Sequence, residues 1–526
     1  MQIDKVKLED TGFFNDIFID YVNRNPKFAP FINQFPDIDD YEKVIKTRKF
    51  SKERRVKLFE ALISQYKDVP AREAVLENIQ SLVKDNCFTV TTGHQLNIFT
   101  GPLFFIYKVV TVLNACKHLN KKYPDYKFVP VFWMASEDHD FEEISTFRLF
   151  GKDYKWETES KGPVGRLHPG SLKSIIDQLP EKVQLFEDAY LKFNRLSESV
   201  RYYVNELFGK HGLVVIEPDS PEFKSFLKDV IIDDLTKFTA HRLVEDSSAQ
   251  LAGNGYKSQV TPREINLFYM NEHMRNRIVY ENGNYRVLDS DISFSKADML
   301  NEARNNPHYF SPNVILRPVY QELILPNICY VGGPAEIAYW IQLKKVFNYY
   351  KIQFPVLLPR NFVLYINHSF SSKIDKLSVK KTDLFLDTHH LKTKYILEKN
   401  GSNVNLEKEV QILQELFESI KYKAISVDKS LEGFVGAEFN KTLKIFDNIE
   451  KKILKSEEKN QDTSIRQLES VKDKLFPDGK LQERTENFLN FYINNPNFID
   501  DMLDSLNPFD QKFNILSEES ADKARK

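Results

Sequence analysis

A run of ionisable residues near position 138 is the part of the sequence best suited to chemistry. The run consists of Glu137, Asp138, His139 and Asp140, with Glu142 and Glu143 close behind. Carboxylates placed in this way can hold an ammonium group, orient a hydroxylated sugar or accept the proton of an attacking amine, and His139 can act as an acid. A solvated acidic turn is the alternative. A divalent metal site is disfavoured because the possible ligands have no regular spacing.

A second polar stretch runs from Thr91 to Pro102 and leads into a helix expected from about residue 103 to 119. Gly101 and Pro102 at the start of this helix suit an anion, because free backbone N–H groups and the positive end of the helix dipole point outward there. Neither GxxxxGK[ST] nor GxGxxG occurs here, which argues against hydride transfer on a nicotinamide. An ordinary strand-to-helix turn, with His94 as a hydrogen-bonded packing residue, is the alternative.

A third group of candidates lies between residues 311 and 360. Gly332 and Gly333 permit close backbone approach, and Arg317 offers a fixed fork for a carboxylate or phosphate. The remaining candidates are Glu336 in a first helical turn, Arg360, whose placement resembles that of Arg317, and the aromatic residues Tyr339 and Trp340. The two aromatic residues either line a pocket or belong to the core.

Short apolar runs that alternate with helix-like segments must position these residues. Such runs are typical of a parallel sheet covered on both faces, and they predict strands at 87–90, 128–134, 213–216, 313–316, 328–331 and 355–358. Polar or glycine residues follow each run. Because ligands bind outside the carboxyl ends of parallel strands, we expect these residues to share one composite pocket.

The sequence as a whole predicts an α/β core, two insertions and a helical arm. Residues 1–372 are expected to form the α/β core, with a helical lead-in over 1–80 and insertions near 150–205 and 221–310 that could cover the pocket. Apolar residues then recur with heptad spacing at Leu406, Val410, Leu413, Phe417, Ile420, Ala424 and Val427. A second seam runs through Phe439, Leu443, Phe446, Ile449 and Ile453, and later through Ile465, Leu468, Val471 and Leu475. These seams predict an antiparallel coiled-coil hairpin over 373–480, with 481–526 packing on the core or the coiled coil.

Composition limits the partners and the compartment. The 526 residues suggest two or three structural units, and 73 basic against 75 acidic residues provide no field that would attract nucleic acid. The three cysteines are scattered, which favours a reducing compartment and argues against a thiolate zinc site. No secretion signal or membrane-length apolar run occurs. We therefore expect a cytoplasmic protein with no nucleic-acid or membrane partner.

Several long motifs resemble the bacillithiol biosynthesis cysteine-adding enzyme family over nearly the whole chain. They are TGHQLNIFTGPLFFIYK, PVFWMASEDHDFEEI, SPNVILRPVYQELILPNICYVGGPAEIAYW and LFPDGKLQER. The family usually has glutamine at the position of His94. The resemblance implies a Rossmann-like core related to class I aminoacyl-tRNA synthetases and a coiled-coil arm that supports a homodimer. No KMSKS-like loop follows Arg360.

The resemblance also implies a reaction, namely amide formation between the cysteine carboxyl and the amine of glucosaminyl malate. An amide made from a free acid needs an activated carboxyl, so an adenine nucleotide (ATP or ADP) is expected and no metal is predicted. Nucleotide or anion contacts are assigned to Gly93, His94, Gln95, Thr100, Gly101 and Lys108, and a second adenine site to Gln482 and Arg484. Substrate orientation and proton transfer are assigned to Asp138, His139 and Asp140. The rest of the pocket is assigned to Glu137, Arg317, Gly332, Gly333, Glu336, Tyr339, Trp340 and Arg360.

Two alternative functions remain open from the sequence. The first is a class I-like nucleotidyltransferase or synthetase relative that activates another acid, which would release pyrophosphate with an amino acid other than cysteine. The second is a non-catalytic adaptor that binds nucleotide and recruits partners through its helical hairpin. For such an adaptor, Asp138→Ala would leave cellular function intact.

Overall fold

A five-stranded parallel sheet forms the centre of the molecule. The computed structural model describes residues 1–69, 71–400 and 404–518. The strands are β2 (Cys87–His94), β3 (Lys127–Met134), β6 (Val214–Ile216), β12 (Asn327–Gly332) and β13 (Val356–Pro359). Their order is β13-β12-β2-β3-β6, and every neighbouring pair is parallel. Nearly all of their residues are buried, as expected for strands covered on both faces.

The strand predicted at 313–316 is wrong. The chain forms β11 (Phe310–Pro312), which pairs antiparallel with β7 (Leu267–Met270) in another sheet, and then enters α14 (Leu316–Ile324). The side-chain oxygen of Asn313 accepts hydrogen bonds from the N–H groups of Ile315 (2.9 Å) and Leu316 (3.3 Å). These bonds hold a turn that leads into the helix within a short apolar run, whose periodicity does not distinguish helix from strand.

Helices pack on both faces of the central sheet. The longest of them in the core, α5 (Phe104–Lys122), packs on β2 and β3 and is buried along most of its length, which agrees with the helix expected after residue 102. Helix α15 (Pro334–Ile341) packs on β12 and β13, followed by α16 (Lys344–Tyr349). The loops that join strands to α5 and α15 therefore lie at the carboxyl edge of the sheet.

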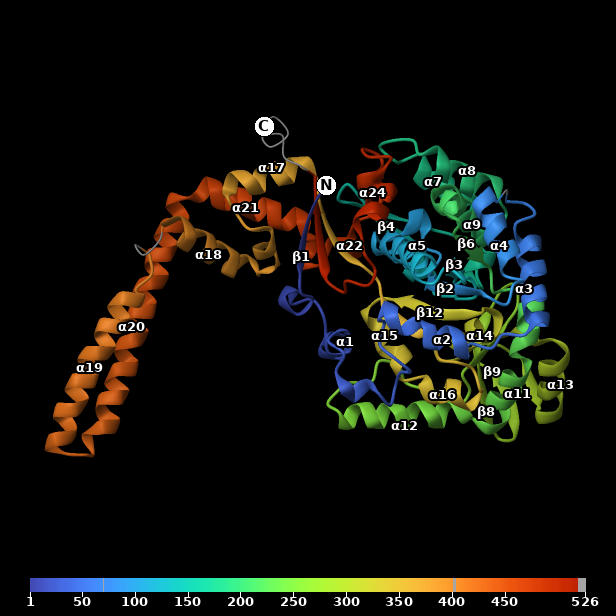
Figure 1. The fold of residues 1–526 in the computed structure, drawn as a ribbon, viewed down its shortest axis with the longest axis horizontal. Coiled ribbons are helices and arrows are strands. Elements are labelled where there is room, and N and C mark those ends of the chain that lie inside the picture. Colours follow the sequence, from blue (N-terminus) through green and yellow to red (C-terminus); the bar gives the residue numbers. More distant parts are fainter. Residues whose placement is uncertain (70, 401–403, 519–526) are drawn as a thin grey trace.

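The N-terminal region is mainly helical, as expected, but it begins with a strand. The helices are α1 (Asp16–Val22), α2 (Tyr41–Thr47), α3 (Lys52–Gln65) and α4 (Glu73–Ser81). The first strand, β1 (Gln2–Val6), pairs antiparallel with β15 (Phe513–Ser517), which pairs parallel with β14 (Phe362–Ile366). Both ends of the described chain thus meet in one small sheet between the core and the helical arm (Figure 1).

Two insertions build walls around the carboxyl edge. The first contains the hairpin β4 (Thr146–Leu149) and β5 (Lys152–Lys155), then α7 (Lys173–Ile176), α8 (Gln184–Lys192) and α9 (Leu196–Phe208). The second contains α10 (Pro221–Lys224), α11 (Lys228–Lys237), α12 (Thr239–Gly253) and α13 (Lys296–Asn305). It also contains strands β8 (Arg275–Glu281), β9 (Asn284–Val287) and β10 (Ser293–Ser295), which join β7 and β11 in an antiparallel sheet.

A long helical hairpin projects from the core (Figure 1). It consists of α19 (Glu407–Val427) and α20 (Leu431–Asn460), and the rings of Phe417 and Phe439 meet across it at 5.2 Å. Ile420, Val427 and Ile449, predicted in the two seams, are exposed instead, because a straight helix drifts away from a strict seven-residue repeat. The later seam residues lie on α21 (Asp462–Leu475), which packs at the base of the arm beside α17 (His368–Leu377) and α18 (Thr388–Asn400).

The chain returns from the arm to the core through three short helices. They are α22 (Gln482–Thr485), α23 (Leu489–Tyr492) and α24 (Phe498–Ser505), and α24 packs on α5. Among the described residues, no helix has the length and apolar content that a membrane crossing requires.

Candidate active site

A cavity of about 450 Å³ lies at the carboxyl ends of β2, β3 and β12, a size that suits small-molecule ligands. Many of the predicted site residues line it: Gly93, His94, Gln95, Lys108, Glu137, Asp138, Arg317, Gly333, Glu336, Tyr339, Arg360 and Arg484. The expected gathering of polar groups into one pocket is therefore observed. Their roles stay predictions.

The acidic run follows the end of β3 and is held by backbone contacts. The N–H of Ala135 donates to the carbonyl of His94 (3.0 Å), and the N–H of Val164 donates to the carbonyl of Asp138 (2.6 Å). A methyl group on Gly165 would lie 2.5 Å from the Cβ of Ser136, so only glycine permits this approach. The first insertion thus fixes the loop that carries the carboxylates.

Asp138 is held in its ionised form. Its carboxylate accepts hydrogen bonds from Nε2 of Gln95 (2.7 Å), from Nη1 of Arg275 (3.2 Å) and from the backbone N–H of His139 (2.8 Å). Burial raises the pKa of Asp138, but the hydrogen bonds from His139 and Gln95 and the charge of Arg275 outweigh it and hold the pKa well below its usual range. Asp138 is therefore a fixed negative charge and a poor proton acceptor.

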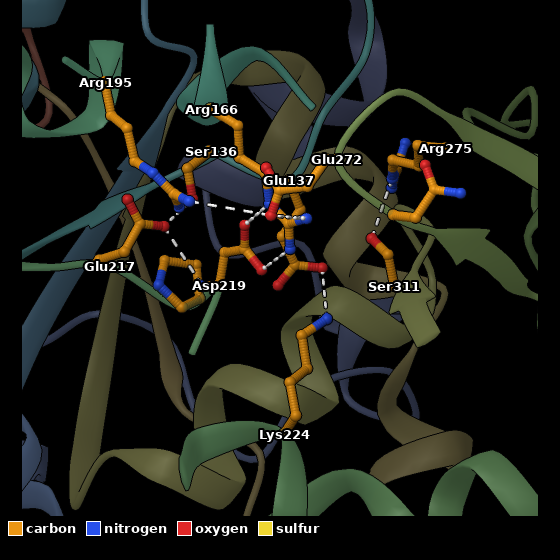
Figure 2. A network of polar contacts seen from close by, with 12 residues as sticks. Ser136, Glu137, Arg166, Arg195, Glu217, Asp219, Lys224, Glu272, Arg275 and Ser311 are labelled. Atoms are coloured by element: carbon orange, nitrogen blue, oxygen red, sulfur yellow. Dashed lines mark hydrogen bonds and ion pairs between the residues drawn. The ribbon is translucent and has the colours of Figure 1, made fainter. Parts of the chain in front are cut away.

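Arg275 is the residue that joins the second insertion to the acidic loop. Its guanidinium also donates to Oγ of Ser311 (2.9 Å) and to the carbonyl of Pro312 (3.0 Å), and it stacks 3.9 Å from the ring of Phe268. The Arg275–Ser311 contact is drawn in Figure 2. The side chain is buried, and the carboxylate of Asp138 compensates its charge.

Glu137 forms a buried ion pair with Lys224, which reaches toward it from α10 (Figure 2). Nζ of Lys224 donates to Oε2 of Glu137 (2.7 Å) and to the carbonyl of Phe310 (2.6 Å). In the same network Arg166 forms a two-pronged contact with Asp219, at 2.7 and 2.9 Å. These ion pairs compensate the charges of Glu137 and Asp219 and hold the acidic loop in place.

Further cations line the cavity from α5 and α14. Lys108 is buried on α5, and its Nζ donates to Oε2 of Glu336 (2.7 Å), which also accepts the N–H of Gly333 (2.9 Å). Burial lowers the pKa of Lys108, while the charge of Glu336 opposes that shift. Arg317 extends from α14 over the rings of Tyr330 and Trp340.

The C-terminal segment adds a further cation to the lining of the cavity. Arg360 forms a fully buried pair with Glu483, with Nη1 2.9 Å from Oε2, and Arg484 next to it lines the cavity. No side-chain hydrogen bond or ion pair is found for Arg484 among the described residues. Burial and the charge of Arg360 lower the pKa of Arg484. Two cations thus face the cavity from the boundary between the core and the C-terminal segment.

His94 is a neutral group in the wall. Its ring stacks on Phe105 (5.1 Å) and meets the edge of Phe104 (5.2 Å). Burial, with the nearby charge of Lys108, lowers its pKa to about 3. Within the described residues its buried Nε2 has no hydrogen-bond partner, so this atom is available to a ligand.

The structure places several predicted residues outside the main cavity. Thr100 and Gly101 are buried beneath the C-terminal segment, where Asn487 donates to the carbonyl of Gly101 (2.7 Å) and the carbonyl of Glu486 accepts the N–H of Leu103 (2.8 Å). The segment that leads into α5 is thus covered by protein. The backbone N–H of Leu103 already has a hydrogen-bond partner there, so it is not available to an anion. Gly101 has a φ of 62°, and a Cβ there would lie 2.5 Å from Asn97.

The other predicted residues that do not line the main cavity make structural contacts instead. Trp340 is a core residue stacked on Tyr330 at 4.3 Å, and the carbonyl of Gly332 accepts the N–H of Arg360 (2.9 Å). His139 lies outside the lining, with Nδ1 3.0 Å from Arg275, and Asp140 caps the short helix α6 (Phe141–Ile144).

Gln482 lies in a different cavity of about 680 Å³, at the base of the arm. Its amide exchanges two hydrogen bonds with the backbone of Tyr365, each of 3.0 Å. This second cavity is bordered by the β4–β5 hairpin, the end of α21 and the residues that follow it, among them Arg148, Lys474 and Asn490.

Arg275 and Glu143 line the cavity without having been assigned to it from the sequence, as do Trp133 and Tyr320. Arg275 lies in an insertion with no motif around it, so no local signal marks it. Glu143 was visible as part of the acidic run, but its sequence position does not show that it turns into the cavity.

Comparisons with known proteins agree over the whole chain. The model of "Bacillithiol biosynthesis BshC, N-terminal Rossmann-like domain" matches residues 1–361, and that of the "C-terminal coiled-coil domain" of the same family matches residues 363–518. Proteins named "Putative cysteine ligase BshC" are similar to this chain. That of Flavobacterium johnsoniae is 38% identical over 98% of this chain and 100% of its own length. That of Flavobacterium psychrophilum is 39% identical over 98% and 99%.

A third relative, from Cytophaga hutchinsonii, is 38% identical over 96% of this chain and 97% of its own length, and carries the same name. These names agree with the predicted enzyme class, a ligase, and the domain matches confirm the predicted fold class. With a parallel-sheet core, a coiled-coil arm and full-length matches on both, the chain belongs to the bacillithiol biosynthesis BshC family.

Proposed function

We propose that this protein is the cysteine ligase of bacillithiol biosynthesis, which forms an amide between the cysteine carboxyl and the amine of glucosaminyl malate. The observation that supports this best is the set of charged side chains that line the main cavity. The carboxylates of Glu137, Asp138 and Glu143 line it beside Arg275, and Lys108, Arg317, Arg360 and Arg484 line it beside Glu336. Both substrates carry an amine and at least one carboxylate, so each has groups that can bind side chains of either charge.

The residues of the chain can perform the positioning that this reaction needs. Asp138, fixed as an anion, suits the ammonium group of the amino acid. Arg317 and Arg484 suit the carboxylates of the second substrate, since a guanidinium binds a carboxylate in a two-pronged manner.

An adenine nucleotide is proposed as the activating substrate. It would convert the cysteine carboxyl into a mixed carboxylic–phosphoric anhydride. The residues present fit an anionic group, because Lys108, Arg360 and Arg484 converge on one wall and His94 leaves Nε2 without a partner among the described residues. A second adenine site is proposed at the second cavity, where Lys474 lies near Gln482; Arg148 there is paired with Asp478 (2.8 Å), and Arg484 lines the main cavity instead.

A homodimer through the arm is proposed as well. Apolar side chains are exposed along the hairpin, among them Ile412 (65%), Leu416 (55%) and Phe434 (63%). Such a surface on a projecting hairpin fits a second copy of the same chain, because two identical apolar faces bury each other around a twofold axis.

We expect the double variant Ile412→Glu, Leu416→Glu to separate the dimer. Four buried charges would face each other across the twofold axis, where like charges are strongly unfavourable. Light scattering should give twice 61.6 kDa for the wild type and 61.6 kDa for the variant, with unchanged helix content by circular dichroism. A wild-type monomer, or a dimeric variant, would refute the proposed interface.

The proposed reaction is tested by mass spectrometry of low-molecular-weight thiols in cells that lack the gene. We expect loss of bacillithiol, accumulation of glucosaminyl malate, and rescue by the wild type but not by Asp138→Ala. The physical reason is that the variant removes the fixed negative charge from the lining of the cavity. Unchanged bacillithiol in the deletion strain would exclude the proposed function.

A further inference from the structure

We propose that Glu143 is the general base of this enzyme and accepts the proton of the attacking amine. The inference rests on the proposed amide-forming function and assigns the proton transfer within it. It also moves that role away from the conspicuous run of Asp138, His139 and Asp140, to a residue that the fold brings into the cavity.

The first argument is the pairing of the carboxylates that line the cavity. Glu137 is paired with Lys224 (2.7 Å), Asp138 with Arg275 (3.2 Å) and Glu336 with Lys108 (2.7 Å). Glu143 also lines the cavity, and no cation pairs with it in the described part of the chain. A carboxylate held by a buried cation resists protonation, so Glu143 is the member of this set best able to accept a proton.

The second argument is the contact between Glu143 and Gln95. Nε2 of Gln95 donates to Oδ2 of Asp138 (2.7 Å) and to Oε2 of Glu143 (3.1 Å), so it holds the two carboxylates side by side. With its nitrogen directed at the carboxylates, Gln95 keeps Oε1 buried and without a partner among the described residues. This acceptor marks a place for an N–H donor of a ligand, next to Glu143.

The groups around Glu143 favour proton acceptance. Burial and the charges of Asp138 and Asp140 raise the pKa of Glu143, and the hydrogen bond from Gln95 opposes this shift only in part. Arg275 and His139 lie on the far side of Asp138, and Lys155 pairs with Glu142 (3.0 Å). A raised pKa brings a carboxylate closer to the operating pH, where a base is most effective. Glu143 is also exposed to solvent, so it can return its proton to water.

The other nitrogen and oxygen groups nearby are less suitable. His94 has a pKa of about 3 and a buried ring, so it does not hold a proton at neutral pH. His139 lies outside the cavity lining, and Asp140 serves as a helix cap, with its Oδ1 accepting the N–H of Glu143 (3.3 Å).

The step balances as follows. The ammonium form of the aminosugar gives one proton to Glu143 and becomes a neutral amine. Its lone pair forms the new C–N bond with the carbonyl carbon of a cysteine carboxylic–phosphoric anhydride. The C–O bond to the phosphoryl group breaks, and the phosphate leaves with that electron pair and takes the second amine proton. Glu143 then releases its proton to solvent.

The test uses the full-length protein with glucosaminyl malate and a preformed anhydride, either cysteinyl adenylate or cysteinyl phosphate. Amide formation is measured by mass spectrometry from pH 6 to pH 9. We expect Glu143→Gln to lower the rate by about 10²-fold or more at pH 6, within the usual range for loss of a general base. The deficit should shrink toward pH 9, because the amine is then already deprotonated in solution.

Glu142→Gln is the matched control, because Glu142 lies outside the cavity lining and its neighbour Lys155 is exposed. This variant should retain the wild-type rate at every pH. A Glu143→Gln protein with the wild-type rate at pH 6, or with a deficit that is the same at pH 6 and pH 9, would overturn the role of Glu143 while leaving the proposed function in place. A wild-type protein that forms no amide from either anhydride would refute the proposed function itself and, with it, the role of Glu143.

Discussion

Arg275→Met is expected to lower kcat/KM for amide formation by about 10²-fold or more. The substitution leaves Asp138 partly buried without its cation, and truncation of one partner in such a pair commonly costs about 2–5 kcal/mol. It also removes the contacts with Ser311 and Pro312 that fix the second insertion against the acidic loop. The assay is the same measurement of amide formation from a preformed anhydride.

Arg275→Met is also expected to change how the activity depends on pH. Without Arg275 the pKa of Asp138 should rise from its depressed value, so Asp138 becomes protonated at a higher pH than in the wild type. Activity of the variant should therefore fall earlier as the pH is lowered. Arg277→Met is the control, because Arg277 lies on the same strand but is exposed. Equal pH profiles for Arg275→Met and the wild type would show that Arg275 does not set the charge of Asp138.

Arg360→Met is expected to lower the free energy of unfolding by about 3–5 kcal/mol, the usual cost of breaking a buried ion pair. Arg360 and Glu483 are almost completely buried, and removal of the cation leaves the Glu483 carboxylate uncompensated. The pair joins the end of the parallel sheet to α22, so the loss should appear in the unfolding transition of the core. Urea denaturation followed by tryptophan fluorescence measures it, since Trp133 and Trp340 report on the core.

Two further variants separate this effect from a general loss of packing. Adding Glu483→Leu to Arg360→Met should recover a large part of the stability, because the second change removes the unpaired carboxylate. Lys57→Met removes an exposed ion pair with Glu53 and should leave the stability almost unchanged, because solvent screens such a pair. A small effect of Arg360→Met alone would mean that Glu483 finds another partner or takes up a proton.

Much of the architecture could be predicted from the sequence because its signals are local. Continuous apolar runs marked the strands of the central sheet, and heptad spacing marked the hairpin of the arm. The prediction was wrong at 313–316, where a turn held by the side chain of Asn313 leads into a helix within a run too short to show its period. It missed β1 because that strand is stabilised by β15, whose residue Ser517 pairs with Gln2 from the other end of the described chain, and such a distant pairing leaves no local pattern.

The sequence by itself determined the acidic run after β3, the apolar strands and the heptads of the arm, because each depends on neighbouring residues. The tertiary structure decided which of the acidic residues face the cavity and which are neutralised. Asp138 acquires Arg275 from 137 residues away, and Arg360 acquires Glu483 from 123 residues away. Chain segments this distant come together only through packing of the insertions and the C-terminal segment on the sheet, and the resulting contacts decide which carboxylates of the site are paired with a cation and leave Glu143 without one among the described residues.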